Sequence, residues 1–295
     1  MKKRQVLSLA FLFLFMQQLQ PIGVFDSGYG GLTVLKDIRA KLPGYDYLYL
    51  GDNARAPYGS RSFETVYRYT LQCVRWFFRQ GCPLVILACN TASAKALRSI
   101  QQNDLPVLAP DKRVLGVIRP TTEIIGSFTK TNEVGILATT GTVLSGSYPI
   151  EIEKFFPQVK VFQEACPMWV PLIEANEFNT PGADYFVEQH IRQLFSKSNR
   201  IDTVLLACTH YPLLQNKIRQ LLPENVTLLS QGSLVAKSLA VYLARHPEID
   251  GQCSKNGQLA FFTTDSTEDF DSQASLFFGQ AVQARHADLE QTIPL

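Results

Sequence analysis

The chain has 295 residues, of which 46% are hydrophobic and 18% charged, a composition typical of globular proteins and unlike that of disordered or fibrous chains. Its 28 basic and 26 acidic residues leave a net charge of +2, so no excess charge points to nucleic acid as the main ligand. The length favours two domains, because one domain usually holds roughly 100–200 residues.

The chain begins with a basic and then apolar segment. Basic residues at positions 2–4 precede an apolar run over 6–16, which resembles the first two regions of a signal peptide. The run is shorter than the ~20 apolar residues of a membrane-spanning helix, and glutamines at 17, 18 and 20 replace the small residues of a cleavage site. We therefore expect residues 1–20 to be an N-terminal extension, with Met16 as an alternative start, and the protein to be cytoplasmic.

From residue 21 onward, short apolar runs alternate with segments of helical period, which predicts βαβ units and mainly parallel sheets. In the first part of the chain, strands are expected at 22–25, 45–50 and 83–88, and helices at 32–42, 63–80 and 90–102. The helix at 63–80 has Val66, Cys73, Val74 and Phe77 at helical spacing and ends at Gly81.

The same alternation continues after Val114. Strands are expected at 133–137, 159–163, 203–207, 226–229 and 259–263, helices at 182–195 and 234–245, and a loop and terminal helix within 267–289. No low-complexity linker interrupts the sequence. The domains are therefore expected to share a tight interface that the chain crosses twice.

Two segments of the chain repeat one pattern. Residues 83–91 and 202–210 each contain an apolar strand that ends in Ala-Cys, at Cys89 and Cys208, and runs into a helix. Open α/β sheets bind ligands at such strand ends, and a helix N-terminus stabilises a thiolate. One such cysteine is usually a small buried residue. Two matching units, 208 − 89 = 119 residues apart, predict two domains with one acid–base sulfur each.

Further polar candidates lie in neighbouring strand–helix loops. Asp26 and Ser27 follow the first strand, where they can orient a thiol or bind an ammonium group, or simply cap the next helix. His210 lies two residues after Cys208 and is either a general acid or base for that thiol or a surface residue. The glycines at 28, 30 and 31 do not form the G-x-G-x-x-G pattern of nucleotide sites.

The other four cysteines lack this context. No two cysteines have the C-x-x-C spacing of a zinc or redox site, and a chain of this size does not depend on disulfides. We therefore expect reduced thiols with structural roles at Cys73, Cys82, Cys166 and Cys253.

With these motifs the chain resembles the glutamate racemase family, within the aspartate/glutamate racemase superfamily. The resemblance extends from residue 22 to about 279 and rests on residues 23–28, 51–59, 88–93 and 207–212, with support from 135–146 and 165–167. It implies that Cys89 and Cys208 are the catalytic thiols. It also implies that neither pyridoxal phosphate, nor a metal, nor any other cofactor takes part.

The family's other roles carry over to matching positions. Asp26 is expected beside Cys89, His210 beside Cys208, and Glu164 as an acidic residue near the second cysteine. The substrate-binding residues that the resemblance implies are Asp26, Ser27, Tyr58, Gly59, Asn90, Thr91, Thr209 and His210. The family interconverts L- and D-glutamate and supplies D-glutamate for peptidoglycan. Its members are often dimers, so a homodimer is expected.

The implied fold class is α/β, with two pseudo-symmetric Rossmann-like domains whose mainly parallel sheets face each other across the active site. We expect residues 21–113 and 227–295 to form domain A, which carries Cys89, and residues 114–226 to form domain B, which carries Cys208.

The sequence is also compatible with two other functions. An aspartate or hydantoin racemase would share the fold and both thiols, whereas a decarboxylase of this superfamily needs only one of them. Side-chain length of the substrate depends on pocket shape, which the sequence does not give. A binding protein, for example a gyrase inhibitor, is the second alternative, although the chain has no strong basic tract.

Overall fold

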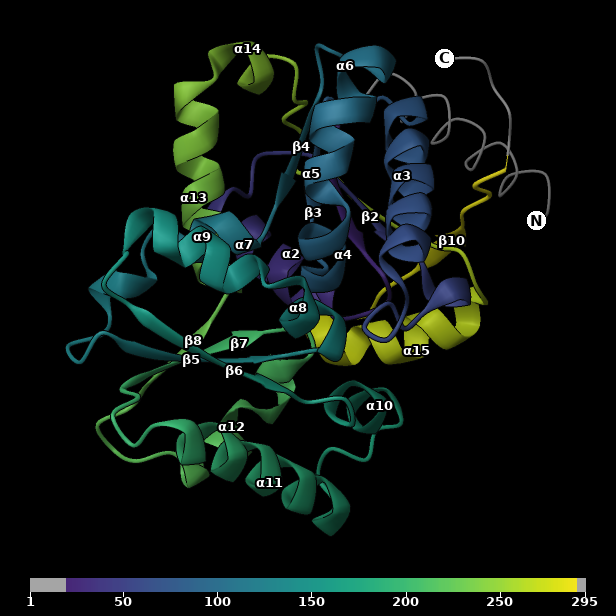
Figure 1. Cartoon of the computed structure of the whole chain (residues 1–295). Coiled ribbons are helices and arrows are strands. Elements are labelled where there is room, and N and C mark those ends of the chain that lie inside the picture. The colour runs from purple at the N-terminus through teal and green to yellow at the C-terminus, as the bar shows by residue number, and fades with distance from the viewer. Residues whose placement is uncertain (1–19, 291–295) are drawn as a thin grey trace.

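Two parallel sheets, one in each half of the molecule, organise the fold (Figure 1). The computed structural model describes residues 20–290. The predictions made for the N-terminal segment, including the apolar run at 6–16 and the alternative start at Met16, lie outside the described residues, which include only Gln20 of that segment.

The larger sheet has six strands in the described part of the chain, in the order β10-β9-β2-β1-β3-β4. They are β1 (Ile22–Asp26), β2 (Tyr47–Gly51), β3 (Leu84–Leu87), β4 (Arg113–Gly116), β9 (Leu259–Thr263) and β10 (Ala284–His286). Its helical segments are α2 (Gly31–Lys41), η1 (Asn53–Arg55), α3 (Phe63–Arg79), α4 (Asn90–Lys95), α5 (Leu97–Ser99), η2 (Ile100–Asp104), α6 (Leu105–Leu108), α13 (Gly232–Arg245), α14 (Pro247–Asp250) and α15 (Thr267–Phe278).

The smaller sheet has the order β6-β5-β7-β8 within the same residues. Its strands are β5 (Glu133–Ala138), β6 (Lys160–Ala165), β7 (Thr203–Ala207) and β8 (Thr227–Ser230). The helical segments around it are α7 (Ile118–Thr122), η3 (Ile125–Ser127), α8 (Thr140–Ser145), α9 (Ser147–Phe155), α10 (Trp169–Glu174), α11 (Pro181–Lys197), η4 (Tyr211–Leu214) and α12 (Gln215–Leu221).

All strand pairs of the two sheets are parallel, which confirms the predicted α/β class. The chain crosses from the larger to the smaller sheet after β4 and returns after β8. The domain boundaries set at 113/114 and 226/227 stay a proposal. Strand pairing favours boundaries a few residues later, because β4 pairs with β3 and β8 pairs with β7.

Helix α3 shows how the sequence fixes an element. The Ser62 side chain accepts a hydrogen bond from the Thr65 amide at 3.2 Å and so caps the first turn. The apolar residues at helical spacing are buried against the sheet. The helix ends before Gly81, whose positive φ of 86° suits glycine.

The predicted helix at 90–102 is irregular. It is divided into α4, α5 and the π-helical segment η2, and the helical path continues through α6. Pro106 in α6 has no amide hydrogen, and its ring crowds the carbonyl four residues earlier, so a regular α-helix cannot run through this point. A wider turn at 100–104 accommodates the proline.

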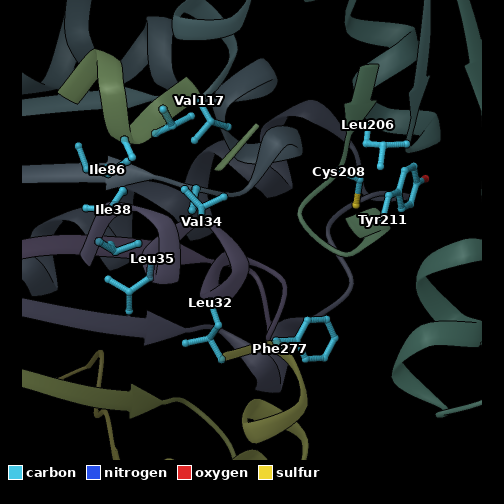
Figure 2. Packing of buried hydrophobic residues seen from close by; sticks show 14 of the residues in the cluster. Leu32, Val34, Leu35, Ile38, Ile86, Val117, Leu206, Cys208, Tyr211 and Phe277 are labelled. Atoms are coloured by element: carbon cyan, nitrogen blue, oxygen red, sulfur yellow. The ribbon is translucent and has the colours of Figure 1, made fainter. Parts of the chain in front are cut away.

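One hydrophobic cluster joins the two halves of the molecule. It includes Leu32 and Val34 of α2 and also Leu206, Cys208 and Tyr211 from the region of β7, as Figure 2 shows. Two further clusters lie on the opposite faces of the sheets, one between the larger sheet and α3 and α4, the other between the smaller sheet and α7 and α9. The shared cluster holds the strand ends of both sheets at one interface.

Candidate active site

A cavity of about 140 Å³ lies between the two halves of the molecule. Loops that follow β1, β3 and β7 meet there, because parallel strands bring their carboxyl ends to one edge of each sheet. Nine of the eleven residues predicted for the site line this cavity, namely Ser27, Tyr58, Gly59, Cys89, Asn90, Thr91, Cys208, Thr209 and His210. Asp26 and Glu164 do not.

Cys89 lies at the N-cap of α4 and is only 5% exposed. Its Sγ accepts a hydrogen bond from the Ala92 amide at 3.5 Å and lies 3.5 Å from Ser27 Oγ. Burial raises the pKa of the Cys89 thiol to about 12, and the nearby Asp26 carboxylate adds to this, whereas the contacts with Ser27 and Ala92 act in the opposite direction. Cys89 is therefore a neutral thiol at neutral pH.

Asp26 lies behind the cavity wall and is fully buried. One carboxylate oxygen accepts a hydrogen bond from the Gly28 amide at 2.9 Å, and the other accepts one from Thr209 Oγ1 at 3.2 Å. Burial raises the pKa of Asp26, although the neighbouring His210 and these hydrogen bonds counteract it. Asp26 thus influences Cys89 electrostatically and links the two halves of the molecule.

Cys208, His210 and Glu174 are connected by two successive side-chain contacts. Its Sγ lies 4.0 Å from His210 Nδ1, and His210 Nε2 lies 2.9 Å from Glu174 Oε1. Burial by itself would lower the pKa of His210, but the contacts with Cys208 and Glu174 outweigh it and raise that pKa to about 10. His210 is therefore an imidazolium at neutral pH. The positive charge of this imidazolium lies beside Cys208 Sγ.

The structure does not bring Glu164 to the cavity. Its two carboxylate oxygens pair with His190 Nδ1 at 3.0 Å and Lys197 Nζ at 2.6 Å, and both partners belong to α11. Side chains alternate between the two faces of a strand, and Glu164 of β6 projects toward this helix. The acidic residue beside the second cysteine is Glu174 of α10, which lines the cavity.

Sequence reasoning missed Glu174. It stands at the end of a short helix that follows the 165–167 motif, and no spacing ties it to His210. The only sequence feature that could have pointed to Glu174 is its place in the helix that follows the 165–167 motif.

The two halves also contact each other beside the cavity. Thr91 Oγ1 lies 3.0 Å from Thr139 Oγ1, and the Gly141 amide donates to the Gly59 carbonyl at 2.8 Å. The Tyr58 hydroxyl is turned toward the Asp52 carboxylate. Tyr58 therefore lines the cavity while its hydroxyl is bound to Asp52.

The remaining cysteines are all free and buried. Cys166 also lines the cavity, and burial raises its pKa well above the usual range, so it is an uncharged wall residue. Residues 20–290 contain no cluster of His, Cys, Asp and Glu suited to a metal ion. In the same range, no helix combines the length and apolar character needed to span a membrane.

Known proteins are similar to this chain in both sequence and fold. A family model described as Asp/Glu/Hydantoin racemase matches residues 22–239. A glutamate racemase from Persephonella marina is 36% identical over 276 residues, which cover 93% of this chain and 99% of the relative.

Two solved structures are similar over 92% of this chain and 98% of their own. One is a glutamate racemase isoform from Bacillus anthracis, with a TM-score of 0.83 and 33% identity. The other is a glutamate racemase from Francisella tularensis in complex with D-glutamate, with a TM-score of 0.81 and 30% identity.

Proposed function

The chain belongs to the Asp/Glu/hydantoin racemase family, and on that premise we propose that it interconverts L- and D-glutamate with Cys89 and Cys208 as its two bases. The observation that carries the proposal is the single cavity lined by both sulfurs, each at the carboxyl end of a strand from a different sheet. Two thiols contributed by different halves of the molecule suit a reaction that removes a proton from one face of a carbon and returns one to the other.

The charges around the two sulfurs favour one direction of this reaction. His210 is an imidazolium beside Cys208, and Cys89 is a neutral thiol. The Cys208 thiolate removes the α-proton, the α-carbon becomes planar, and the Cys89 thiol donates its proton to the opposite face. Cys208 then holds the proton and Cys89 the negative charge, so the same groups run the reverse reaction in exchanged roles.

The carbanion needs stabilisation because no cofactor delocalises its charge in this proposal. Backbone amides at Asn90 and Thr91 belong to the first turn of α4, where helical amides have no partner within the helix. They can donate hydrogen bonds to the substrate α-carboxylate as negative charge grows on it. The buried Asp26 carboxylate behind the wall provides a counter-charge for the substrate ammonium group.

Glutamate is favoured over aspartate by the relatives. Curated proteins that are 35–40% identical to this chain are named glutamate racemases. The cavity volume of about 140 Å³ is about ten times the minimum that holds one water, which suits a small amino acid of either length. The volume alone does not choose between the two substrates.

We infer from the same family membership that the protein works in the cytoplasm, as a homodimer, and supplies D-glutamate for peptidoglycan. Leu144 of α8 and Ile150 of α9 support a homodimer, because these apolar side chains are 80% and 50% exposed. Light scattering of the purified protein tests the assembly directly, and a monomer at micromolar concentration would contradict it.

Circular dichroism tests the reaction itself. Purified protein is mixed with L-glutamate or D-glutamate in separate cuvettes, with L- and D-aspartate as controls. We expect the optical signal of both glutamate enantiomers to decay to zero, and that of aspartate to persist. Decay with aspartate alone would select the aspartate alternative, and decay with neither would leave a binding role.

A further inference from the structure

We propose that Tyr148 and Gln231 are positioning residues that fix the orientation of the Asn90 side-chain amide in the cavity. A buried chain of hydrogen bonds links the two crossings between the sheets to Asn90. The inference rests on the proposed function, because Asn90 is taken there as part of the substrate site.

The contacts form one continuous path. The Gln231 side-chain amide Nε2 donates to the Tyr148 hydroxyl at 2.8 Å, and the Tyr148 hydroxyl donates to Asn90 Oδ1 at 2.6 Å. Gln231 Nε2 also contacts the Val117 carbonyl at 3.0 Å and Thr121 Oγ1 at 3.2 Å. Tyr148 and Thr121 are fully buried, and Gln231 and Asn90 nearly so.

The Val117 carbonyl sets the direction of the whole path. A backbone carbonyl can only accept a hydrogen bond, so the amide end of Gln231 must face it. The same Nε2 then donates to the Tyr148 oxygen, which leaves the Tyr148 proton for Asn90. Asn90 therefore presents its oxygen to Tyr148, because a reversed amide would leave the buried Tyr148 proton without an acceptor.

Asn90 is left with one free donor. Its Nδ2 has no hydrogen-bond partner among the described residues, although it is buried, and Asn90 lines the cavity. A buried donor without a partner is costly, and a substrate carboxylate oxygen in the cavity would satisfy it. Tyr148 thus does not contact the substrate in this proposal, but decides that Asn90 offers a donor and not an acceptor.

The path also begins where the chain changes sheets. Val117 follows β4 at the first crossing, and Gln231 follows β8 at the second. Tyr148 of α9 joins them to Asn90 at the start of α4. Both crossings and the substrate-binding amide are therefore held by one set of hydrogen bonds.

A double-mutant cycle on kcat/KM tests the proposal. Tyr148→Phe removes the donor to Asn90, and we expect it to lower kcat/KM by about tenfold in both directions, the equivalent of one buried hydrogen bond. Gln231→Met leaves the Tyr148 proton in place and is expected to cost only about threefold, less than a full hydrogen bond. Combining Tyr148→Phe with Asn90→Ala should be no worse than Asn90→Ala alone, because Tyr148 acts only through Asn90.

Tyr47→Phe is the matched control. It removes a tyrosine hydroxyl bond to the Leu42 carbonyl, 2.7 Å long, from another buried tyrosine that does not line the cavity. We expect a loss of thermal stability similar to that of Tyr148→Phe and an unchanged kcat/KM. This separates positioning from a general loss of stability.

Two results would overturn the proposal. One is an unaltered kcat/KM in Tyr148→Phe, and the other is a double variant whose fold-loss in kcat/KM equals the product of the two single fold-losses. If Tyr148→Phe does not fold, the same cycle with Gln231→Met and Asn90→Ala decides in its place. If the unaltered protein does not racemise glutamate, the proposed function fails instead. The same double-mutant cycle is then measured through the affinity for D-glutamate by calorimetry. Additive losses of binding free energy in the double variant, or no binding by the unaltered protein, would equally refute the positioning role.

Discussion

At the scale of single residues, the two catalytic candidates have different surroundings. Cys89 contacts Ser27 and lies near the Asp26 carboxylate, whereas Cys208 lies beside the His210 imidazolium. The two sulfurs therefore have different electrostatic surroundings. Replacing each thiol should therefore affect the activity of the protein differently.

Replacing either cysteine by serine should abolish racemisation, because a serine hydroxyl is far too weak an acid to replace a thiolate base. A substrate with a leaving group on the β-carbon needs chiefly one base for elimination. Cys89→Ser and Cys208→Ser should therefore each retain elimination with one enantiomer, and with opposite ones. Release of the leaving group from each pure enantiomer measures this. Retention of the same enantiomer by both variants would show that the thiols are not opposed.

Glu174→Gln should lower the pKa of His210, because it removes a carboxylate that holds the imidazolium. In the folded protein this pKa is raised from 6.5 to about 10. A raised pKa contributes stability that is fully present below about pH 6.5 and is lost as the pH rises through about 10. The difference in unfolding free energy between Glu174→Gln and the unaltered protein should follow the same course.

An NMR titration of the His210 ring measures this pKa directly in both proteins. Glu188→Gln provides a control, since Glu188 forms an exposed pair with Arg192 on α11. A His210 titration that is unchanged by Glu174→Gln would contradict the assigned role of Glu174.

The sequence predicted the residues that directly follow strands and missed the one that acts through another side chain. Cys89, Cys208 and His210 occur in motifs whose position at a strand end can be read from apolar patterning. The pairing of Glu174 with His210 depends on how α10 packs against the loop after β7. The family resemblance implied another acidic residue, Glu164, near the second cysteine. Side-chain direction on β6 decided against it.

At the scale of elements, strands with continuous apolar runs were predicted to within one or two residues, for example β1, β7 and β9. β4 and β10 were missed. β10 has only three residues and β4 four, and both are partly exposed, so neither has the apolar run by which a buried strand is recognised.

The start of α2 is held against the second half of the molecule, and Gly30→Ala tests this contact. A Cβ atom at Gly30 would overlap Thr209 Oγ1 and His210 Nδ1. We expect a loss of roughly 1–3 kcal/mol in unfolding free energy from overpacking, together with a fall in kcat as His210 shifts. Gly44→Ala is the control, because nothing lies within 4 Å of its added Cβ. Urea unfolding and kcat measure both effects, and equal behaviour of the two variants would refute the contact.

At the scale of the whole molecule, the shared hydrophobic cluster predicts one unfolding transition. The cluster contains residues of both halves, and exposing either half would uncover apolar surface of the other. We expect calorimetry to give a single peak whose calorimetric and van't Hoff enthalpies agree. Two resolved peaks would show that the halves unfold independently.

The burial of both sulfurs has a consequence for successive turnovers under the proposed mechanism. Cys89 and Cys208 are only 5% and 7% exposed, so we expect their protons to exchange slowly with bulk water. Each turnover ends with the proton on the opposite sulfur. After product release, the protonation states of the two sulfurs therefore still depend on which enantiomer was released. The proton must return to the first sulfur before the protein can repeat the same conversion. At high substrate concentration this resetting step, rather than proton abstraction, would limit the rate, and the opposite enantiomer would perform the reset.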